Sequence, residues 1–218
     1  MRLFAAIVPP RAVLEEVARA VPSPSASTDS APPRRGLFRR SAGRGAHTSD
    51  RPVHVTAPND ELDLPDVDKM YIPITSFGNV TLGDSLKLAN AMRAEVATWR
   101  RPDVRFHGGA ALEFPGDESV WAKLTGDIDD LMTIGRGVPL VVQRLGFFVD
   151  RRQFRPWLSV GTITDHTTAP YLETVVAALD ALEGEQWTVD SVWLMQRPPE
   201  STGPLDFTPM ERMPLAGH

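Results

Sequence analysis

Apolar residues recur at helical spacing in three stretches of the chain, residues 11–21, 84–99 and 169–182. In each stretch the apolar positions are three or four apart, so they would form one stripe along a helix. The clearest stripe, in residues 84–99, consists of Leu86, Leu88, Ala89, Met92, Val96 and Trp99. We therefore expect three amphipathic helices, the last of them capped by Gly184, because glycine is common just after a helix ends.

Shorter apolar or alternating runs between these stretches predict β-strands. The first is Arg2 to Val8, which stops at a double proline. The run Met70 to Ser76 contains Pro73, which lacks a backbone N–H and restricts the strand to a sheet edge or a bulge. A further helix is expected over residues 127–134, ending before two closely spaced glycines. The remaining strands are expected at residues 53–57, 104–106, 120–124, 154–164, 187–194 and 206–210.

The composition is that of an ordinary globular protein, with 42% hydrophobic and 23% charged residues among 218. Strands and helices interleave without a fixed repeat, which predicts an α+β fold in a single domain spanning residues 1–218. No apolar run approaches the ~20 residues that span a bilayer. The chain has no cysteine, which excludes disulfides and thiolate chemistry and leaves the cytoplasm as the expected compartment.

Charge is distributed unevenly along the chain. The net charge is −5, yet residues 22–51 carry six arginines against two aspartates, which leaves a net charge of −9 on the rest. Because this segment is rich in Ser, Pro and Gly, we expect a disordered insertion. One interpretation is an arm that contacts nucleic acid or an anionic surface. The alternative, which we favour, is a solvated insertion that its arginines keep soluble. The candidate contact residues are Arg34, Arg35, Arg39, Arg40 and Arg44.

The sequence lacks the short motifs typical of phosphate-binding loops, dinucleotide folds, zinc proteases and serine hydrolases. Its five histidines are scattered without the spacing of metal ligands, so neither a metal nor a cofactor is expected. His107 precedes two glycines, which could expose it near a site, but a histidine at a strand end is the interpretation we favour. His166 lies in a turn-like stretch and is expected to be an exposed polar residue.

The order of several segments is similar to that of a known family. Met1 to Pro10 resembles the first strand of the two-histidine (2H) phosphoesterase superfamily, whose bacterial members are described as RNA 2′,3′-cyclic phosphodiesterases or 2′-5′ RNA ligases. Residues 74–80 resemble the end of its first motif strand, and residues 152–160 resemble the approach to its second motif. Further similar segments are residues 104–115 with 120–121, 145–147 and 187–194. The resemblance implies two βαβ-type lobes with antiparallel sheets around a central cleft.

The chemistry of that family depends on two His-x-Thr/Ser motifs, whose histidines act as general base and general acid on a phosphodiester. In the second motif of this chain, Trp157 stands at the histidine position and Ser159 supplies the hydroxyl. The first motif has two possible registers, Tyr71 with Pro73 or Pro73 with Thr75, and neither contains a histidine. An indole does not exchange protons near neutral pH, and a phenol ionises only near ~10.

One literal His-x-Thr occurs elsewhere, at His54-Val55-Thr56. It could be a displaced first motif. However, the segment that resembles the end of the motif strand follows Thr75 instead, about twenty residues later in the chain. A single motif also cannot provide both the acid and the base. We therefore favour a half-buried strand histidine beside the insertion.

Three functions remain open from the sequence. The first is a catalytically impaired family member that at most binds a nucleotide or an RNA phosphate end, through Tyr71, Arg155, Trp157 and Ser159. The second is an active RNA 2′,3′-cyclic phosphodiesterase with an unusual residue set such as His54, Tyr71 and Ser159. The third is a structural or regulatory protein that makes its contacts through the basic insertion. We favour the first.

Overall fold

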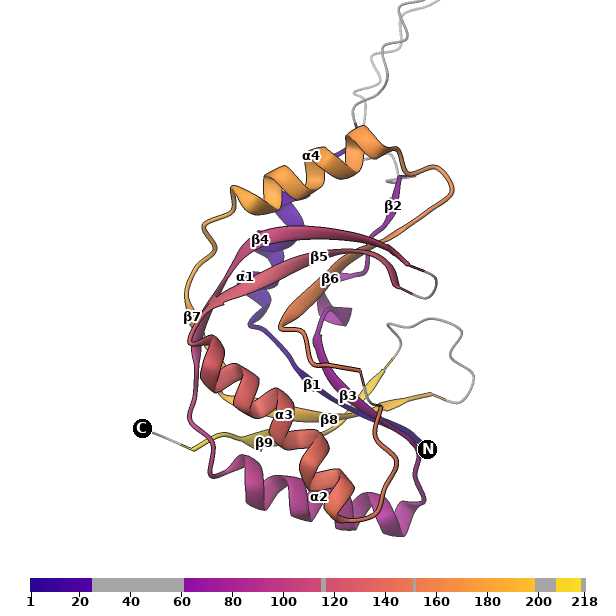
Figure 1. Cartoon of the computed structure of the whole chain (residues 1–218), viewed down its shortest axis with the longest axis vertical. Coiled ribbons are helices and arrows are strands. Elements are labelled where there is room, and N and C mark those ends of the chain that lie inside the picture. The colour runs from indigo at the N-terminus through magenta and orange to yellow at the C-terminus, as the bar shows by residue number, and fades with distance from the viewer. Residues whose placement is uncertain (25–60, 115–116, 151, 199–206, 217–218) are drawn as a thin grey trace, which may run out of the picture.

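The structure is a computed structural model, in which the described residues form two antiparallel sheets with helices on their outer sides (Figure 1). The described residues are 1–24, 61–114, 117–150, 152–198 and 207–216. The predictions made for the insertion beyond its first three residues, for the strand at residues 53–57 and for His54 therefore lie outside the described residues. That residues 1–218 form one domain stays a prediction.

The first sheet, sheet A, has the strand order β3-β1-β8-β9. Its strands are β1 (Arg2–Ile7), β3 (Ile72–Asn79), β8 (Ser191–Arg197) and β9 (Thr208–Pro214). The predicted first strand is thus confirmed. Pro73 lies in β3, at the edge of the sheet, where one side of the strand needs no backbone donor.

The second sheet, sheet B, has the strand order β2-β6-β5-β4-β7 and is curled into an open half-barrel (Figure 1). Its strands are β2 (Leu62–Asp63), β4 (Asp103–Phe114), β5 (Asp117–Gly126), β6 (Trp157–Ile163) and β7 (Trp187–Thr188). β4 and β5 form one long hairpin, which is longer than the two short strands expected from the sequence. β6 begins directly after Pro156, so the predicted strand starts three residues later than expected.

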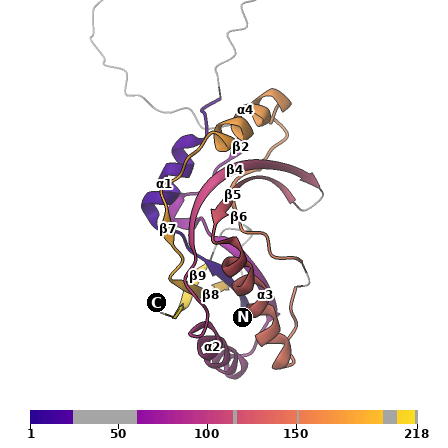
Figure 2. The same cartoon turned by 60° about the vertical axis from the view of Figure 1, so that its left-hand side comes forward.

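The helices are α1 (Arg11–Ala20), α2 (Leu82–Val96), α3 (Ile128–Arg144), α4 (Ala169–Asp180) and the short 3₁₀ helix η1 (Val67–Lys69). α2 contacts β8 and β9, and α3 contacts β3 and α2, whereas α4 packs on β4 and contacts α1. The two pairs therefore lie at opposite ends of the molecule (Figure 2). The predicted helices at residues 11–21, 84–99 and 169–182 are confirmed. Among the described helices, none has the length and apolar character needed to cross a membrane.

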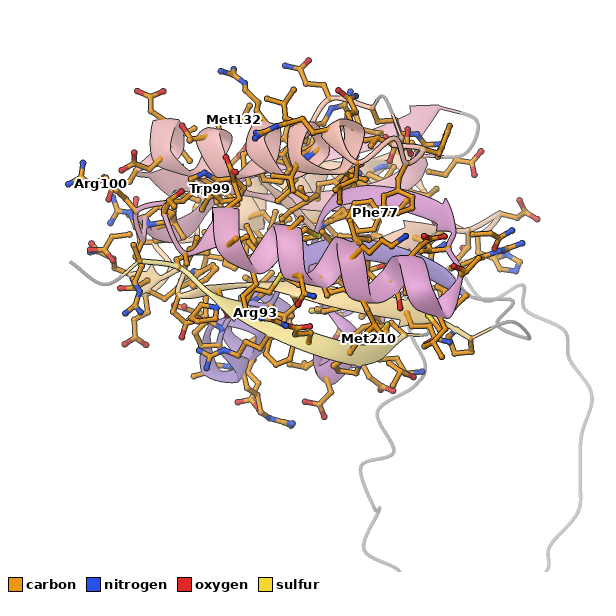
Figure 3. All side chains as sticks on the ribbon, turned by 90° about the horizontal axis from the view of Figure 1, so that it is seen from below. Phe77, Arg93, Trp99, Arg100, Met132 and Met210 are labelled. Atoms are coloured by element: carbon orange, nitrogen blue, oxygen red, sulfur yellow. The ribbon has the colours of Figure 1, made fainter. Side chains whose placement is uncertain are left out.

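Helix α3 corrects the prediction that glycines end it. It continues through Gly135, Gly137 and Pro139 to Arg144. A Cβ at position 135 would lie 1.9 Å from the ring of Phe154, and one at position 137 would lie 2.4 Å from the ring of Trp99. The glycines therefore allow close packing against two aromatic rings, and Trp99 is seen beside α3 in Figure 3. Packing of this kind outweighs a helix-propensity cost of about 1 kcal/mol for each glycine.

Two further predictions near the C-terminus were wrong in detail. Residues 187–194 do not form one strand, because β7 pairs with β4 in sheet B and β8 pairs with β1 in sheet A. Gly184 does not cap α4, which ends at Asp180 and has Ala181, in helical conformation, as its C-cap residue. Instead Gly184 packs on β4, where a Cβ would lie 2.9 Å from the carbonyl oxygen of Phe106.

Strand β1 separates two apolar clusters, because alternate side chains of a strand point to opposite faces. Leu3, Ala5 and Ile7 belong to the main core, which is continuous between the two sheets. Phe4 and Ala6 belong to a small second cluster together with Tyr71 and Met195.

The ion pair between Arg93 of α2 and Glu211 of β9 joins the helix to the sheet edge, and Arg93 is seen above β9 in Figure 3.

Candidate functional site

A cavity of about 920 Å³ lies between the two sheets. Its walls come from β1, β3 and β8 of sheet A, from β5 and β6 of sheet B, and from the segment that leads from α3 into β6. The two strands that resemble the motif strands, β3 and β6, contact each other where the sheets meet. The cavity therefore lies at the place where the resemblance puts a central cleft.

The segment between α3 and β6 is hydrogen-bonded to β3. The backbone N–H of Asp150 donates to the carbonyl of Ser76 in β3 at 3.0 Å. The Thr75 hydroxyl donates to the carbonyl of Asp150 at 3.4 Å. The exposed edge of β3 is thus partly paired, and the Thr75 hydroxyl, a candidate motif residue, is already engaged by the backbone of this segment.

The structure brings most of the predicted site residues together. Tyr71, Pro73, Thr75, Arg155 and Trp157 all line the cavity. Ser159 does not line it, although it pairs directly with Trp121 of β5, which does. His54, the low-probability catalytic candidate, lies outside the described residues.

On the sheet-A side, Tyr71 is held among aromatic rings. It is buried, with its ring centroid 5.1 Å from that of Phe4 and 5.2 Å from that of Phe207, which meets it edge-on. Arg197 stacks on the ring of Phe4, with its Cζ 5.5 Å from the ring centroid. Its Nη2 donates a hydrogen bond to the Tyr71 hydroxyl at 3.5 Å. The phenol is therefore packed among aromatic rings and hydrogen-bonded to Arg197.

On the sheet-B side, Trp157 is half-buried and lies beside two cations. The guanidinium carbon of Arg155 is 5.2 Å from the indole centroid, and the ammonium of Lys123 is 5.7 Å from it. Both distances are typical of cation–π contacts. Arg155 also lies 3.6 Å from a carboxylate oxygen of Asp117. The indole thus serves as a platform for protein cations.

The charged groups of the cavity are mostly arginines. Arg2, Arg152, Arg155 and Arg197 line it, against the two carboxylates of Asp117 and Asp150. Arg155 pairs with Asp117, and Arg152 pairs with Asp150 at 3.6 Å. Within the described ranges, no carboxylate pairs with Arg2 or Arg197. The cavity therefore carries net positive charge in an acidic protein, and could attract an anion.

The two described histidines lie away from the cavity. His107 Nδ1 is 3.0 Å from the carbonyl oxygen of Leu182 and 3.5 Å from a carboxylate oxygen of Glu183, at the junction of β4 with the end of α4. This fits a histidine on a strand rather than a catalytic one. His166 is exposed in a turn, as expected. In the part of the chain that the structure describes, no cluster of three His, Asp or Glu side chains is placed to hold a metal ion.

Sequence reasoning missed Arg2, Arg197 and Trp121 as cavity residues. Arg2 precedes the apolar run of β1 and alternates with Phe4, which was a signal that it shares a face with that ring. Arg197 and Trp121 gave no such signal, because their nearness to the motif positions depends on how β8 and β5 are placed in two different sheets.

An α/β architecture of two antiparallel sheets around a cleft is the fold of the 2H phosphoesterases, so the predicted fold class is confirmed. TT0787 of Thermus thermophilus superposes with a TM-score of 0.62 at 17% identity, over 100% of this chain and 99% of that chain. E. coli LigT complexed with 3′-AMP superposes with a TM-score of 0.62 at 14% identity, over 99% and 98% of the two chains. E. coli LigT complexed with phosphate superposes with a TM-score of 0.60 at 12% identity, over the same shares. No family model and no curated protein matches the sequence.

Proposed function

We propose that this chain is a divergent 2H phosphoesterase that binds the phosphate of a nucleotide or an RNA end in its cavity and has lost most of its hydrolytic activity. One observation carries this proposal. Trp157 and both candidate positions of the first motif histidine, Tyr71 and Pro73, line the cavity, whereas the described histidines, His107 and His166, do not.

Loss of activity follows from the chemistry of the reaction. Opening a cyclic phosphodiester requires one group to take a proton from the attacking oxygen and another to protonate the leaving oxygen. Each such group commonly accelerates a reaction by ~10²–10⁴-fold. Neither a phenol nor an indole is an effective proton carrier near neutral pH, so little hydrolytic activity should remain.

Retention of binding is supported by the charge of the cavity and by the fold. The four arginines present guanidinium groups, which suit phosphate oxygens well. E. coli LigT, which has the same fold, has been crystallised with 3′-AMP, phosphate, ATP and NADP⁺. Ser159 stays a candidate contact through its position beside Trp121.

The test uses the purified full chain. We expect no opening of 2′,3′-cyclic AMP, or of RNA with a 2′,3′-cyclic end, above the rate without protein, together with saturable binding of 3′-AMP in isothermal titration calorimetry. Turnover that disappears in His54→Ala would overturn the proposal and establish the enzyme with His54, Tyr71 and Ser159. Turnover that survives His54→Ala would overturn it as well, because other groups would then supply the acid and the base.

The basic insertion supports a second, separate hypothesis, that of a contact arm. The described residues that flank it are both fixed near the start of α4: the Tyr171 hydroxyl donates to the carbonyl of Pro22 at 2.9 Å, and the Thr168 hydroxyl donates to the Glu61 carboxylate at 2.9 Å. α4 packs on Gly109 of β4, on the face of sheet B opposite to Trp121 and the cavity.

The arm hypothesis can be tested without disturbing the cavity. We expect that replacing the six arginines of residues 22–51 by glutamine weakens RNA association and lowers its salt dependence, because fewer counterions are released. Affinity for 3′-AMP should stay within about twofold of wild type, since the α4 residues that bind Pro22 and Glu61 lie on the face of sheet B opposite to the cavity. Unchanged association with both RNA and anionic vesicles would remove the arm.

A further inference from the structure

Two arginines of the cavity are direct cross-strand neighbours. Arg2 of β1 and Arg197 of β8 are paired residues in the antiparallel register of sheet A. Side chains of directly opposite residues lie on the same face of a sheet, and both of these line the cavity. Like charges in this position repel each other and destabilise the sheet. An arrangement of this kind is relieved when an anion lies between the charges.

The hydrogen-bonding capacity of the residues around the cavity is also incompletely used. Three buried side-chain polar atoms among the described residues have no hydrogen-bond partner, and two of them, Arg197 Nε and Trp121 Nε1, belong to residues that line this cavity. Both atoms are donors only. An unsatisfied buried donor is costly, and a ligand with several acceptor oxygens would supply the missing partners after small side-chain rotations.

Arg197 is already held in place for such a ligand. Its guanidinium lies over Phe4 and reaches the Tyr71 hydroxyl, so little rotational freedom is left to lose on binding. Arg2 is exposed and can adjust its position. The other two cavity arginines differ, because the carboxylates of Asp117 and Asp150 already neutralise them.

We infer that Arg2 and Arg197 form a clamp that selects a phosphomonoester dianion over a phosphodiester monoanion. This inference rests on the proposed function and specifies its ligand. Two uncompensated guanidinium groups match two negative charges, and each can donate in bidentate fashion to phosphate oxygens. A 2′,3′-cyclic phosphate carries one charge and leaves half of the clamp uncompensated. The ligand is therefore the opened, 3′- or 5′-phosphorylated end of a nucleotide or RNA.

The clamp also predicts a pH dependence, which arises in the ligand. The second ionisation of a phosphomonoester has a pKa near ~6, so the dianion is lost as the pH falls from 7.5 to 5.0. A cyclic phosphodiester has no ionisation in this range. The other charged or ionisable groups that line the cavity are Tyr71, Asp117, Asp150, Arg152 and Arg155.

The experiment measures binding to the full chain by isothermal titration calorimetry, with 3′-AMP, 2′,3′-cyclic AMP, adenosine and inorganic phosphate as probes. At pH 7.5 we expect 3′-AMP to bind at least about 10-fold more tightly than 2′,3′-cyclic AMP, and its affinity to fall about 10-fold at pH 5.0 while that of the cyclic nucleotide stays constant. Inorganic phosphate should compete with 3′-AMP, and adenosine should not.

Substitutions then show which residues produce the preference for 3′-AMP over 2′,3′-cyclic AMP. Arg2→Gln and Arg197→Gln should each lower the affinity for 3′-AMP by about 10-fold or more and that for 2′,3′-cyclic AMP by less than about 3-fold. Arg136→Gln is the matched control, because it removes the same charge from an exposed position of α3. In thermal melts without ligand, Arg2→Gln should be as stable as wild type or more stable, since a repulsion is removed, whereas Arg197→Gln also loses its contacts with Phe4 and Tyr71. Phosphate should stabilise neither variant.

The outcomes separate this inference from the proposed function. Equal affinity for 3′-AMP and 2′,3′-cyclic AMP, without turnover, would overturn the clamp and leave the proposed function standing. A preference for 3′-AMP that persists in both clamp variants would also overturn the clamp. Absence of binding by every nucleotide would overturn both. Destabilisation of ligand-free Arg2→Gln would contradict the repulsion between the two arginines and overturn the clamp.

Discussion

The two walls of the cavity are alike in their aromatic residues and different in their charge. Tyr71 on the sheet-A wall and Trp157 on the sheet-B wall each stand beside an arginine. On the sheet-B wall Asp117 neutralises that arginine, whereas on the sheet-A wall Arg197 and Arg2 have no carboxylate partner among the described residues. The comparison teaches that two walls with similar aromatic residues differ in charge compensation: the arginine beside Trp157 is paired with a carboxylate, and the arginines near Tyr71 are not within the described residues.

The largest expected effect on stability comes from overpacking the contact between α3 and Phe154, a residue of the cavity wall. In Gly135→Ala the new Cβ would lie 1.9 Å from the ring of Phe154, which lines the cavity just before Arg155. We expect this variant to lose about 2–3 kcal/mol of unfolding free energy in urea titrations, the upper range for overpacked cores. Affinity for 3′-AMP should change by less than about 3-fold if the sheet-A wall carries the ligand.

The matched control for this variant is Gly83→Ala in α2, where a Cβ would meet nothing within 4 Å. There the substitution should leave stability unchanged or raise it by up to about 1 kcal/mol, because alanine favours a helix over glycine. Equal stability of the two variants would contradict the close packing of α3 on Phe154.

A direct comparison of the walls uses one arginine from each. Arg197→Gln should weaken 3′-AMP binding by about 10-fold, or about 1.4 kcal/mol, because an uncompensated cation is removed. Arg155→Gln should weaken it by less than about 3-fold, because the charge removed was already paired with Asp117. Calorimetric titration of both variants decides the matter. Similar losses in the two would mean that the ligand bridges the walls.

A smaller effect is expected at α2, which covers sheet A away from the cavity. The Thr81 side chain accepts a hydrogen bond from the backbone N–H of Asp84 at 3.2 Å and caps the helix. Thr81→Ala should cost about 1 kcal/mol of unfolding free energy. It should leave 3′-AMP affinity unaltered, so a fall in affinity would show that binding follows general stability rather than the clamp.

The same cap predicts the sign of a pH effect. The hydrogen bond from the Thr81 hydroxyl lowers the pKa of Asp84 below its ordinary value of 3.8. The carboxylate of Asp84 is therefore stabilising above pH 3.8, and this contribution is lost as the pH falls through the lowered pKa. The stability difference between wild type and Thr81→Ala, measured by urea unfolding, should narrow below pH 3.8. A constant difference down to pH 2 would contradict the hydrogen bond.

The smallest effect tests the aromatic residues themselves. Tyr71→Phe removes the hydroxyl that Arg197 reaches at 3.5 Å, and should weaken 3′-AMP binding by about 2- to 3-fold through a less well-ordered arginine. Trp157→Phe should leave that affinity within about 2-fold of wild type. If Trp157→Phe has the greater effect in calorimetric titrations, the ligand stacks on the indole and the sheet-B wall is the binding wall.

Much of the fold could be predicted, because its signals are local. The strand of residues 2–8 and the three amphipathic helices rest on spacing within a few residues, and the edge position of Pro73 rests on its missing N–H. Predictions failed where contacts between residues far apart in the sequence determine the structure. Gly135 does not end α3, since Phe154 packs on it, and residues 187–194 divide between two sheets.

The sequence alone determined the first strand and the three amphipathic helices, because their signals depend on which residue types follow one another along the chain. The replacement of the motif histidines stays a prediction. Only the tertiary structure decided that Arg2 and Arg197, 195 positions apart in the chain, stand side by side beneath the cavity while Arg155 is neutralised. The physical reason is that charge compensation depends on distances in space, and antiparallel pairing between the two ends of a chain sets those distances without a local trace in the sequence.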